Sequence, residues 1–258
     1  MTTGTDEFLV ERRGEVVIMT LNRPAKLNAY TPEMFDALTA SFAEFNADDS
    51  LRVAILTGAG DRAFCAGADL GNTITRITGG GGRHWTDMTK RFFSDVYKPI
   101  IAAVNGMAIS GGTEMLLGTD LRIAVPSATF GLGEVRFGIT PGGGSHTRLP
   151  RQIPWAVAME LLLLGQTITA ERAREVGLIN KVVEPEHLLD EALAMADLLC
   201  ANAPLAVRAA KEIAVRGMAL ETPFSMEYLI SDPVLRSEDA KEGPQAFAEK
   251  RKPVWRGR

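Results

Sequence analysis

Two glutamates, Glu114 and Glu134, lie twenty residues apart, and each closely follows a glycine-bearing turn, at 110–112 and 131–133. Two carboxylates that share one water-filled site can act as a general base and a general acid, provided that their protonation states differ. Either glutamate alone is more readily interpreted as a solvated surface residue. Two of them in matched turns favour the interpretation as an acid–base pair.

The turn before Glu114 carries a second kind of chemistry. An apolar strand predicted over Ile100–Val104 runs into a glycine-rich turn that opens a helix near Gly111. The first N–H groups of a helix lack intrahelical partners and lie at the positive end of its dipole. Glycine also lets a ligand approach the backbone closely. The segment therefore predicts a site for a developing oxyanion, the alternative being a strand–helix junction whose glycines serve packing.

Other catalytic motifs are absent or ambiguous. Gly131–Gly133 has no further glycine three residues on, and Gly142–Gly144 is not followed by Gly-Lys-Ser/Thr, so the dinucleotide and Walker patterns are missing. No G-x-S-x-G serine elbow occurs. Cys65 could be a nucleophile, but its apolar context favours a buried structural thiol. The three histidines are far apart, so we expect no metal site.

Positioning these residues requires a series of short strands and amphipathic helices. The predicted strands are apolar runs bounded by turn residues, at Phe8–Arg12, Val16–Leu21, Val53–Thr57, Ile100–Val104, Leu121–Val125 and Leu178–Val183. The predicted helices begin at caps or prolines, or end at glycine or proline; they start at Thr31-Pro32, span about Trp85–Tyr97 and Pro154–Leu164, and run from the cap Thr169 to Gly177. Residues 71–82, with four consecutive glycines, are expected to form a mobile loop.

The order of these elements predicts an α/β fold with a helical end. A strand–turn–strand–helix unit recurs along the first part, and from about Glu186 only helical patterns follow. We therefore expect an α/β catalytic core over 1–190 and a C-terminal helical packing or oligomerisation region over 191–258.

Composition narrows the functional classes. The chain has 258 residues, 46% hydrophobic content and a net charge of −4, which argues against a general nucleic-acid surface. No apolar run approaches the roughly 20 residues needed to span a bilayer, so no membrane association is expected. Cys65 and Cys200 form no disulfide framework, and the N-terminus is unlike a signal peptide; both favour the cytoplasm.

Six motifs, in this order, resemble the enoyl-CoA hydratase/isomerase family, the crotonases, from about residue 8 to the C-terminus. Each motif is weak alone, whereas the ordered set is highly specific. They are Arg23–Asn28, Phe64–Leu70, Asn105–Gly112, Phe130–Glu134, Thr140–Pro150 and Phe247–Lys252. The resemblance implies a crotonase-type spiral of repeated ββα units with a C-terminal helical region, and assembly into homotrimers, often paired into hexamers.

The same resemblance implies an acyl-CoA thioester as substrate and no metal or redox cofactor. The backbone N–H groups of Ala68 and Gly111 would form the oxyanion hole, and Glu114 and Glu134 match the two catalytic glutamates of the hydratases. Positions that resemble substrate-binding ones are Lys26, Leu27, Ala66, Ala68, Asp69, Leu70, Gly111, Pro141, Gly142, Phe247 and Lys250.

Within that set, Ala66 would contact the adenine through its backbone. Phe247 and Lys250 resemble tail residues that reach the CoA of a neighbouring subunit, although Lys250 is equally compatible with a solvated charge. Two departures leave the acyl pocket unspecified. Gly133 stands where family members often have proline, and glycine at this position would aim Glu134 less rigidly. Ser145-His146 replaces the usual Gly/Thr-Gln pair.

The function that we predict is hydration of 2-enoyl-CoA esters, in the pathway of fatty-acid β-oxidation. Isomerisation, dehydration and thioester hydrolysis are alternatives within the family, because a fold does not define a reaction. A non-catalytic CoA-binding or RNA-binding homologue is an alternative of another class. The two glutamates and the acidic net charge count against it.

Overall fold

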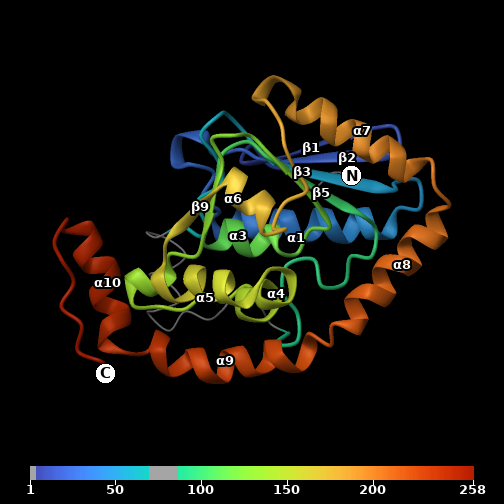
Figure 1. Cartoon of the computed structure of the whole chain (residues 1–258). Coiled ribbons are helices and arrows are strands. Elements are labelled where there is room, and N and C mark those ends of the chain that lie inside the picture. Colours follow the sequence, from blue (N-terminus) through green and yellow to red (C-terminus); the bar gives the residue numbers. More distant parts are fainter. Residues whose placement is uncertain (1–3, 70–86) are drawn as a thin grey trace.

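The computed structural model describes residues 4–69 and 87–258, and Figure 1 shows its strands with helices packed around them. Two predictions, Leu70 as a substrate-binding residue and the mobile loop at 71–82, lie outside the described residues.

A six-stranded sheet forms the body of the molecule. Its strands, in the order β1-β2-β3-β5-β7-β10, are Phe8–Arg13, Val16–Leu21, Val53–Gly58, Ile100–Val104, Leu121–Ala124 and Lys181–Val182. β1 and β2 form the predicted antiparallel hairpin, and the other neighbours pair in parallel. β5 is buried along its whole length, because a parallel strand covered on both faces must be apolar throughout.

A smaller sheet follows the same chain order. Its strands, in the order β4-β6-β8-β9, are Ala63–Cys65, Met107–Ile109, Thr129–Gly131 and Thr167–Thr169. The consecutive pairs β3–β4, β5–β6 and β7–β8 each place one strand in the large sheet and one in the small sheet. This repetition is the spiral of strand-pair units that the sequence predicts, so the predicted fold class is confirmed.

Two buried asparagines hold the turn between β3 and β4. The Nδ2 of Asn28 donates to the carbonyl oxygens of Ala59 and Ala63, at 2.9 and 2.7 Å. The Nδ2 of Asn105 donates to Gly60 and Ala63 oxygens, at 2.8 and 3.1 Å. Buried carbonyls need such partners, so these side chains determine where the chain crosses from one sheet to the other.

Helix starts predicted from caps are confirmed. α1 (Pro32–Ala47) begins where the Thr31 hydroxyl accepts the Met34 N–H at 3.2 Å. α6 (Ala170–Glu175) begins in the same way at Thr169. α5 (Trp155–Leu164) also matches its prediction. α4 (Ser145–Gln152) is not predicted, because its Pro150 and the preceding glycines are turn signals that buried tertiary contacts override.

The predicted helix at 85–97 is wrong over its described part, 87–97, which consists of turns. Phe93 has a φ of +60°, outside the helical region. The buried Arg91 guanidinium also takes the carbonyls of Met88 and Lys90, at 3.0 and 2.6 Å, as its own acceptors. Tertiary burial of one arginine therefore outweighs the local helical pattern.

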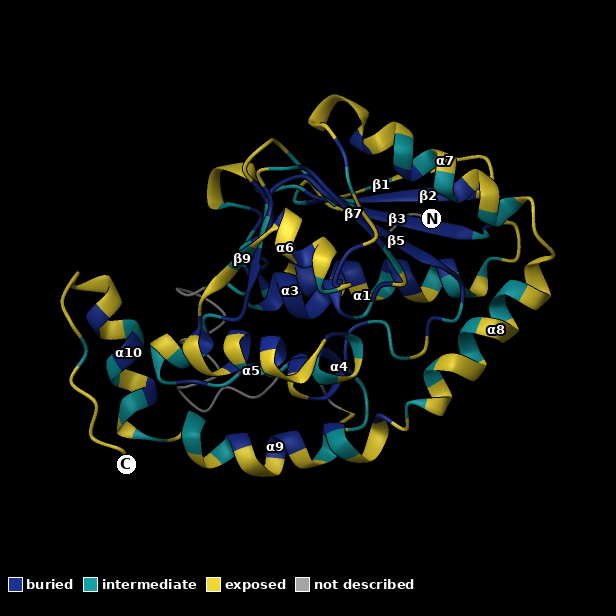
Figure 2. Cartoon of the chain, viewed as in Figure 1, coloured by how far each residue is buried: buried dark blue, intermediate teal, exposed yellow. Residues whose placement is uncertain are grey.

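The C-terminal helices divide into two groups. α7 (Leu188–Cys200) packs against β3 and β5, so the predicted boundary at 190/191 falls inside a helix of the core. α8 (Pro204–Gly217), α9 (Glu221–Leu235) and α10 (Glu238–Ala248) curve around the body to its far side. Figure 2 shows that the central strands β2, β3 and β5 are buried while α8 presents mostly exposed residues.

In the part of the chain that the structure describes, no single helix is long and apolar enough to cross a bilayer. The length and composition of a span are met only by joining Pro185–Cys200, which includes η4 (Pro185–His187), to Pro204–Gly217 across a bend of 104°.

Candidate active site

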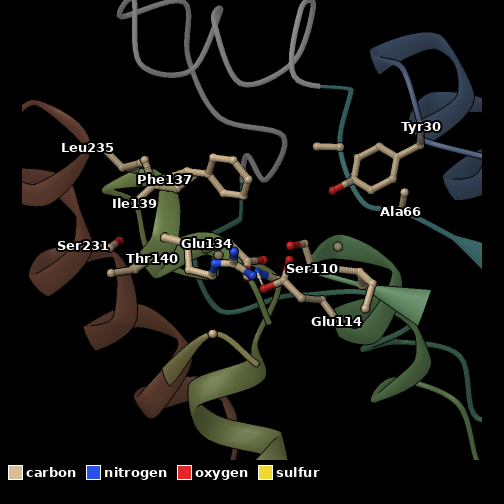
Figure 3. A pocket seen from close by; sticks show the side chains of 18 of the residues that line it. Tyr30, Ala66, Ser110, Glu114, Glu134, Phe137, Ile139, Thr140, Ser231 and Leu235 are labelled. Carbon is tan, nitrogen blue, oxygen red and sulfur yellow. Dashed lines mark hydrogen bonds between the residues drawn. The ribbon is translucent and has the colours of Figure 1, made fainter. Parts of the chain in front are cut away.

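A cavity of about 430 Å³ opens between the small sheet, the turn after β8 and helix α9. Its wall is largely apolar, with Phe35, Ile139 and Leu235 among the lining residues. Figure 3 shows Glu114 and Glu134 reaching this cavity from two different elements. The structure thus brings together the two carboxylates that the sequence analysis paired.

Glu114 is carried by α3 (Gly111–Leu116), which starts directly after Ser110. Ser110 has a φ of +52° and a ψ of −122°, an uncommon conformation for serine that turns the chain sharply from β6 into the helix. α3 has only 6 residues, fewer than about two turns. Individual N–H groups, rather than the dipole of a long helix, are therefore the donors at this turn.

Thr113 fixes α3 against the small sheet. Its hydroxyl lies 2.7 Å from the Ala108 oxygen and 2.9 Å from the Gly131 oxygen, and it accepts the Gly131 N–H at 3.2 Å. Because Ala108 belongs to β6 and Gly131 to β8, this one buried residue sets the spacing between the two glutamate-bearing segments.

Two backbone N–H groups face the cavity from neighbouring segments. Ala68 and Gly111 both line it, and neither N–H donates to another described residue. Gly67 brings the segments together: it has a φ of +99°, and a Cβ there would lie 3.1 Å from the nitrogen of Gly111. Only glycine suits that conformation and that close approach. The pair therefore has the form of an oxyanion hole.

Glu114 is 5% exposed and well supplied with donors. Its Oε1 accepts the Gly143 N–H at 2.6 Å and the Ser145 hydroxyl at 3.2 Å. Burial raises the pKa of Glu114 to about 7, and these two hydrogen bonds oppose the rise because they favour the ionised form. A carboxyl with a pKa near neutrality suits acid–base chemistry.

Glu134 is the other buried carboxyl group of the cavity. It begins η3 (Glu134–Phe137), is 7% exposed, and its Oε2 is buried without a hydrogen-bond partner among the described residues. Burial raises the pKa of Glu134 well above its usual range, and the nearby charge of Glu114 raises it further. A hydrogen bond from the Ser110 side chain opposes this rise. The surroundings of Glu134 thus favour its protonated form.

Comparison with known proteins identifies the family. The model of the enoyl-CoA hydratase/isomerase family matches residues 11–258. The chain belongs to the enoyl-CoA hydratase/isomerase family. An enoyl-CoA hydratase of Mycobacterium tuberculosis is 44% identical over 260 residues, covering 98% of this chain and 97% of that protein.

Other members of the family are similarly close. The (E)-benzylidenesuccinyl-CoA hydratase of Thauera aromatica is 41% identical over 251 residues, covering 96% of this chain and 98% of that one. A solved carnitinyl-CoA dehydratase from Mycobacterium avium superposes with a TM-score of 0.88, at 41% identity, covering 98% of this chain and 100% of its own. The resemblance predicted from the ordered motifs is confirmed.

Some predicted CoA-binding residues of this family member meet at the cavity. Ala66 lines it, and its N–H donates to the Leu27 oxygen at 3.0 Å, which places Lys26 at the exposed surface of η1 (Pro24–Lys26) beside it. Gly142 also lines the cavity, from the far side.

Others lie outside the described lining. Asp69 forms an ion pair with Arg23, with 3.2 Å between Oδ2 and Nη1, and so braces the segment that carries Ala68. Pro141 is buried behind Gly142 and does not line the cavity. Asp69 and Pro141 thus lie next in sequence to lining residues, Ala68 and Gly142, without lining the cavity themselves.

The two tail residues, Phe247 and Lys250, lie in different surroundings. Phe247 of α10 lines the cavity of its own chain and stacks edge-on against Phe137, with 5.4 Å between ring centroids. Lys250 is exposed and does not line the cavity. The resemblance implied that both reach the CoA of a neighbouring subunit, which stays a prediction. Within one chain, Phe247 is 59% exposed and lines the same cavity as Glu134.

The departures predicted from the sequence have different consequences. Gly133 has a φ of −87°, which other residues adopt, and a Cβ there would lie 3.7 Å from the Ser110 hydroxyl in ordinary contact. Gly133 thus has an ordinary backbone conformation, and its looser aim of Glu134 relative to proline stays a prediction. The Ser145 hydroxyl donates a hydrogen bond to Glu114, and Nδ1 of His146 lies 3.0 Å from Oε1 of Glu227.

Sequence reasoning missed a buried ionic cluster beside Glu114. Oε2 of Glu227 accepts the Arg91 Nε–H at 2.9 Å, and these side chains are only 3% and 0% exposed. The charge of Glu227 raises the pKa of Glu114, while that of His146 lowers it. The arginine and glutamate are 136 residues apart, so no local spacing could have revealed the pair.

The surroundings of Cys65 assign its role. Cys65 is fully buried, which raises the pKa of its thiol to about 12, so it is a structural thiol rather than a nucleophile. Within residues 4–69 and 87–258, no group of three or more His, Cys, Asp or Glu side chains is placed to hold a metal ion.

Proposed function

We propose that this protein is an enoyl-CoA hydratase, which reversibly adds water across the double bond of a 2-enoyl-CoA thioester. One observation carries the proposal: two buried carboxyl groups with raised pKa values, Glu114 and Glu134, share a cavity with the N–H groups of Ala68 and Gly111, which have no acceptor among the described residues. Each of the three demands of hydration, a base, an acid and an oxyanion site, has a group in place.

Their environments assign the roles. Glu114, with two donors on Oε1, is the ionised base that takes a proton from water as the water oxygen bonds to C3 of the enoyl group. The electron pair of the double bond moves to form an enolate, whose oxygen accepts the N–H groups of Ala68 and Gly111. Glu134, the protonated carboxyl, then gives its proton to C2, which completes the addition of one water.

Double-bond isomerisation needs a single group that removes and returns one proton, so it would leave Glu114 unexplained. Dehydration uses the same groups in reverse, since the two directions share a transition state. The relatives named as hydratases and as carnitinyl-CoA dehydratase fit this pair of directions.

The CoA portion of the substrate would lie across the mouth formed by Lys26, Leu27 and Ala66, with Phe247 over the opposite side.

We further propose that the chain forms trimers or pairs of trimers. Leu205, Ile213 and Leu229 on α8 and α9 are 81%, 72% and 70% exposed in the single chain, an apolar surface that assembly would cover. Action in the cytoplasm, in β-oxidation, stays a prediction.

A spectrophotometric assay with crotonyl-CoA tests the function. Hydration removes the conjugated enoyl thioester, so its absorbance should fall and 3-hydroxybutyryl-CoA should appear in the product analysis. Release of free CoA would instead indicate thioester hydrolysis. Binding of CoA esters with no change in any of them would favour a non-catalytic CoA-binding protein.

A further inference from the structure

We propose that the phenolic hydroxyl of Tyr30 is a third hydrogen-bond donor to the thioester oxygen, beside the N–H groups of Ala68 and Gly111. This inference rests on the proposed hydratase function and adds to it a catalytic residue that the sequence analysis did not single out.

The backbone of Tyr30 is built into the oxyanion site. Its N–H donates to the Gly67 oxygen at 2.9 Å, and its oxygen accepts the Asp69 N–H at 2.9 Å. These two bonds form a parallel bridge between Tyr30 and Ala68. The segment that carries one donor of the oxyanion hole is therefore held directly by Tyr30.

The side chain of Tyr30 reaches the other donor. A Cβ built on Gly111 would lie 2.7 Å from both the hydroxyl oxygen and Cε1 of Tyr30. In a helix the Cα–Cβ direction tilts towards the N-terminus, the end from which the first N–H groups project. The hydroxyl thus lies against Gly111, the residue that carries the second N–H donor, in space that any side chain at 111 would take.

The ring is held rigidly and the hydroxyl faces the cavity. Tyr30 is 5% exposed and packs against Phe35 and Phe92, with centroids 6.1 and 6.2 Å away. Figure 3 shows its hydroxyl directed into the cavity, on the side of Ser110 and Glu114. A donor fixed before the reaction needs little reorganisation when charge develops.

The hydroxyl also stays protonated. Burial, followed by the charge of Glu114, raises the pKa of Tyr30 well above its ordinary value, so the group is a neutral donor at any pH at which the enzyme would work. A thioester oxygen gains negative charge as the enolate forms. A third donor at that position therefore stabilises the transition state more than the bound substrate.

Tyr30→Phe tests the proposal, because it removes the hydroxyl and keeps the ring that packs on Phe35 and Phe92. The matched control is Tyr97→Phe, which removes a hydroxyl from a ring that stacks with Arg216 outside the cavity. For Tyr30→Phe we expect kcat and kcat/KM with crotonyl-CoA to fall together, by a factor on the order of 10². Tyr97→Phe should match the wild type.

A binding measurement separates this role from packing. The absorbance of 4-dimethylaminocinnamoyl-CoA shifts to longer wavelength when its carbonyl is polarised, so the wild type should produce a red shift that Tyr30→Phe reduces at an unchanged Tm. A full red shift, with kcat within about twofold of the wild type, would overturn the proposal.

This second readout does not require turnover. If the wild type hydrates no enoyl-CoA but polarises the chromophore, and Tyr30→Phe loses that shift, the hydratase proposal fails while the donor role of Tyr30 is supported. If neither protein binds the chromophore, both proposals are overturned.

Discussion

The N–H of Gly143 donates a hydrogen bond to Oε1 of Glu114 at 2.6 Å, and Gly143 also lies close to that carboxylate. A Cβ at 143 would lie 2.7 Å from Oε2 and 2.9 Å from Cδ of Glu114. The glycine run of the 140–144 motif thus serves the proposed base directly, by orienting it and by favouring its ionised form.

Gly143→Ala should therefore displace Glu114 and lower kcat for crotonyl-CoA, by a factor on the order of 10² if the carboxylate moves by about 1 Å. Gly217→Ala on α8, where a Cβ would meet nothing within 4 Å, is the matched control. Steady-state kinetics check the result. Unaltered kcat in Gly143→Ala would show that the position of Glu114 does not limit the reaction.

Glu114→Gln and Glu134→Gln preserve shape but remove the base and the acid. Each should lower kcat by a factor on the order of 10² or more, and the double variant should lose little beyond either single one if both groups hold the same water. Glu160→Gln on the exposed side of α5 is the control. If Glu114→Gln keeps hydration while Glu134→Gln abolishes double-bond migration, the isomerase reading replaces ours.

The pH profile should follow the two carboxyls. Glu114 must be ionised to act as a base, so kcat/KM should rise with pH through the pKa of about 7 that burial gives it. Glu134 must be protonated to act as an acid, and its pKa is raised by burial and by Glu114, so activity should fall again only at higher pH. A profile that is flat from about pH 5 to about pH 8 would contradict these roles.

Glu227→Gln should destabilise the fold strongly. It leaves the Arg91 guanidinium, which is fully buried, without its carboxylate. We expect a loss of about 3 kcal/mol in the free energy of unfolding, as for other broken buried ion pairs. The exposed pair Lys181–Glu191 is the comparison, and Glu191→Gln should cost less than about 1 kcal/mol. Urea denaturation at one protein concentration measures both, and equal losses would refute the distinction.

Assembly can be tested on the apolar outer surface of α8 and α9. Light scattering at micromolar concentration should give the mass of a trimer or a hexamer, and Leu229→Glu should lower that mass because it buries a charge in the interface. Leu9 on β1 is also exposed, at 44%, and lies on another element, so Leu9→Glu should leave the mass unchanged. A monomeric wild type would exclude the proposed assembly.

Much of the site followed from contiguous residues. The helix caps at Thr31 and Thr169 and the hairpin are local patterns, and each formed as predicted. The strand predicted over Leu178–Val183 is an exception, because only Lys181–Val182 pairs, as β10. The glutamates, together with their glycine turns, were recognisable because the chemistry of an oxyanion and of an acid–base pair needs those residue types in that order. These features could be predicted from the sequence because their physical causes act over a few neighbouring residues.

Tertiary structure alone decided what surrounds them. The strands of the small sheet are 3 residues each, too short for an alternating pattern. The Arg91–Glu227 pair joins distant segments and replaces a predicted helix with turns. No local pattern marks Tyr30, because its side chain comes close to Gly111 only in the folded chain. Burial raises the pKa values of both Glu114 and Glu134. Burial is a property of the packed chain, because it depends on every segment that excludes water from the site.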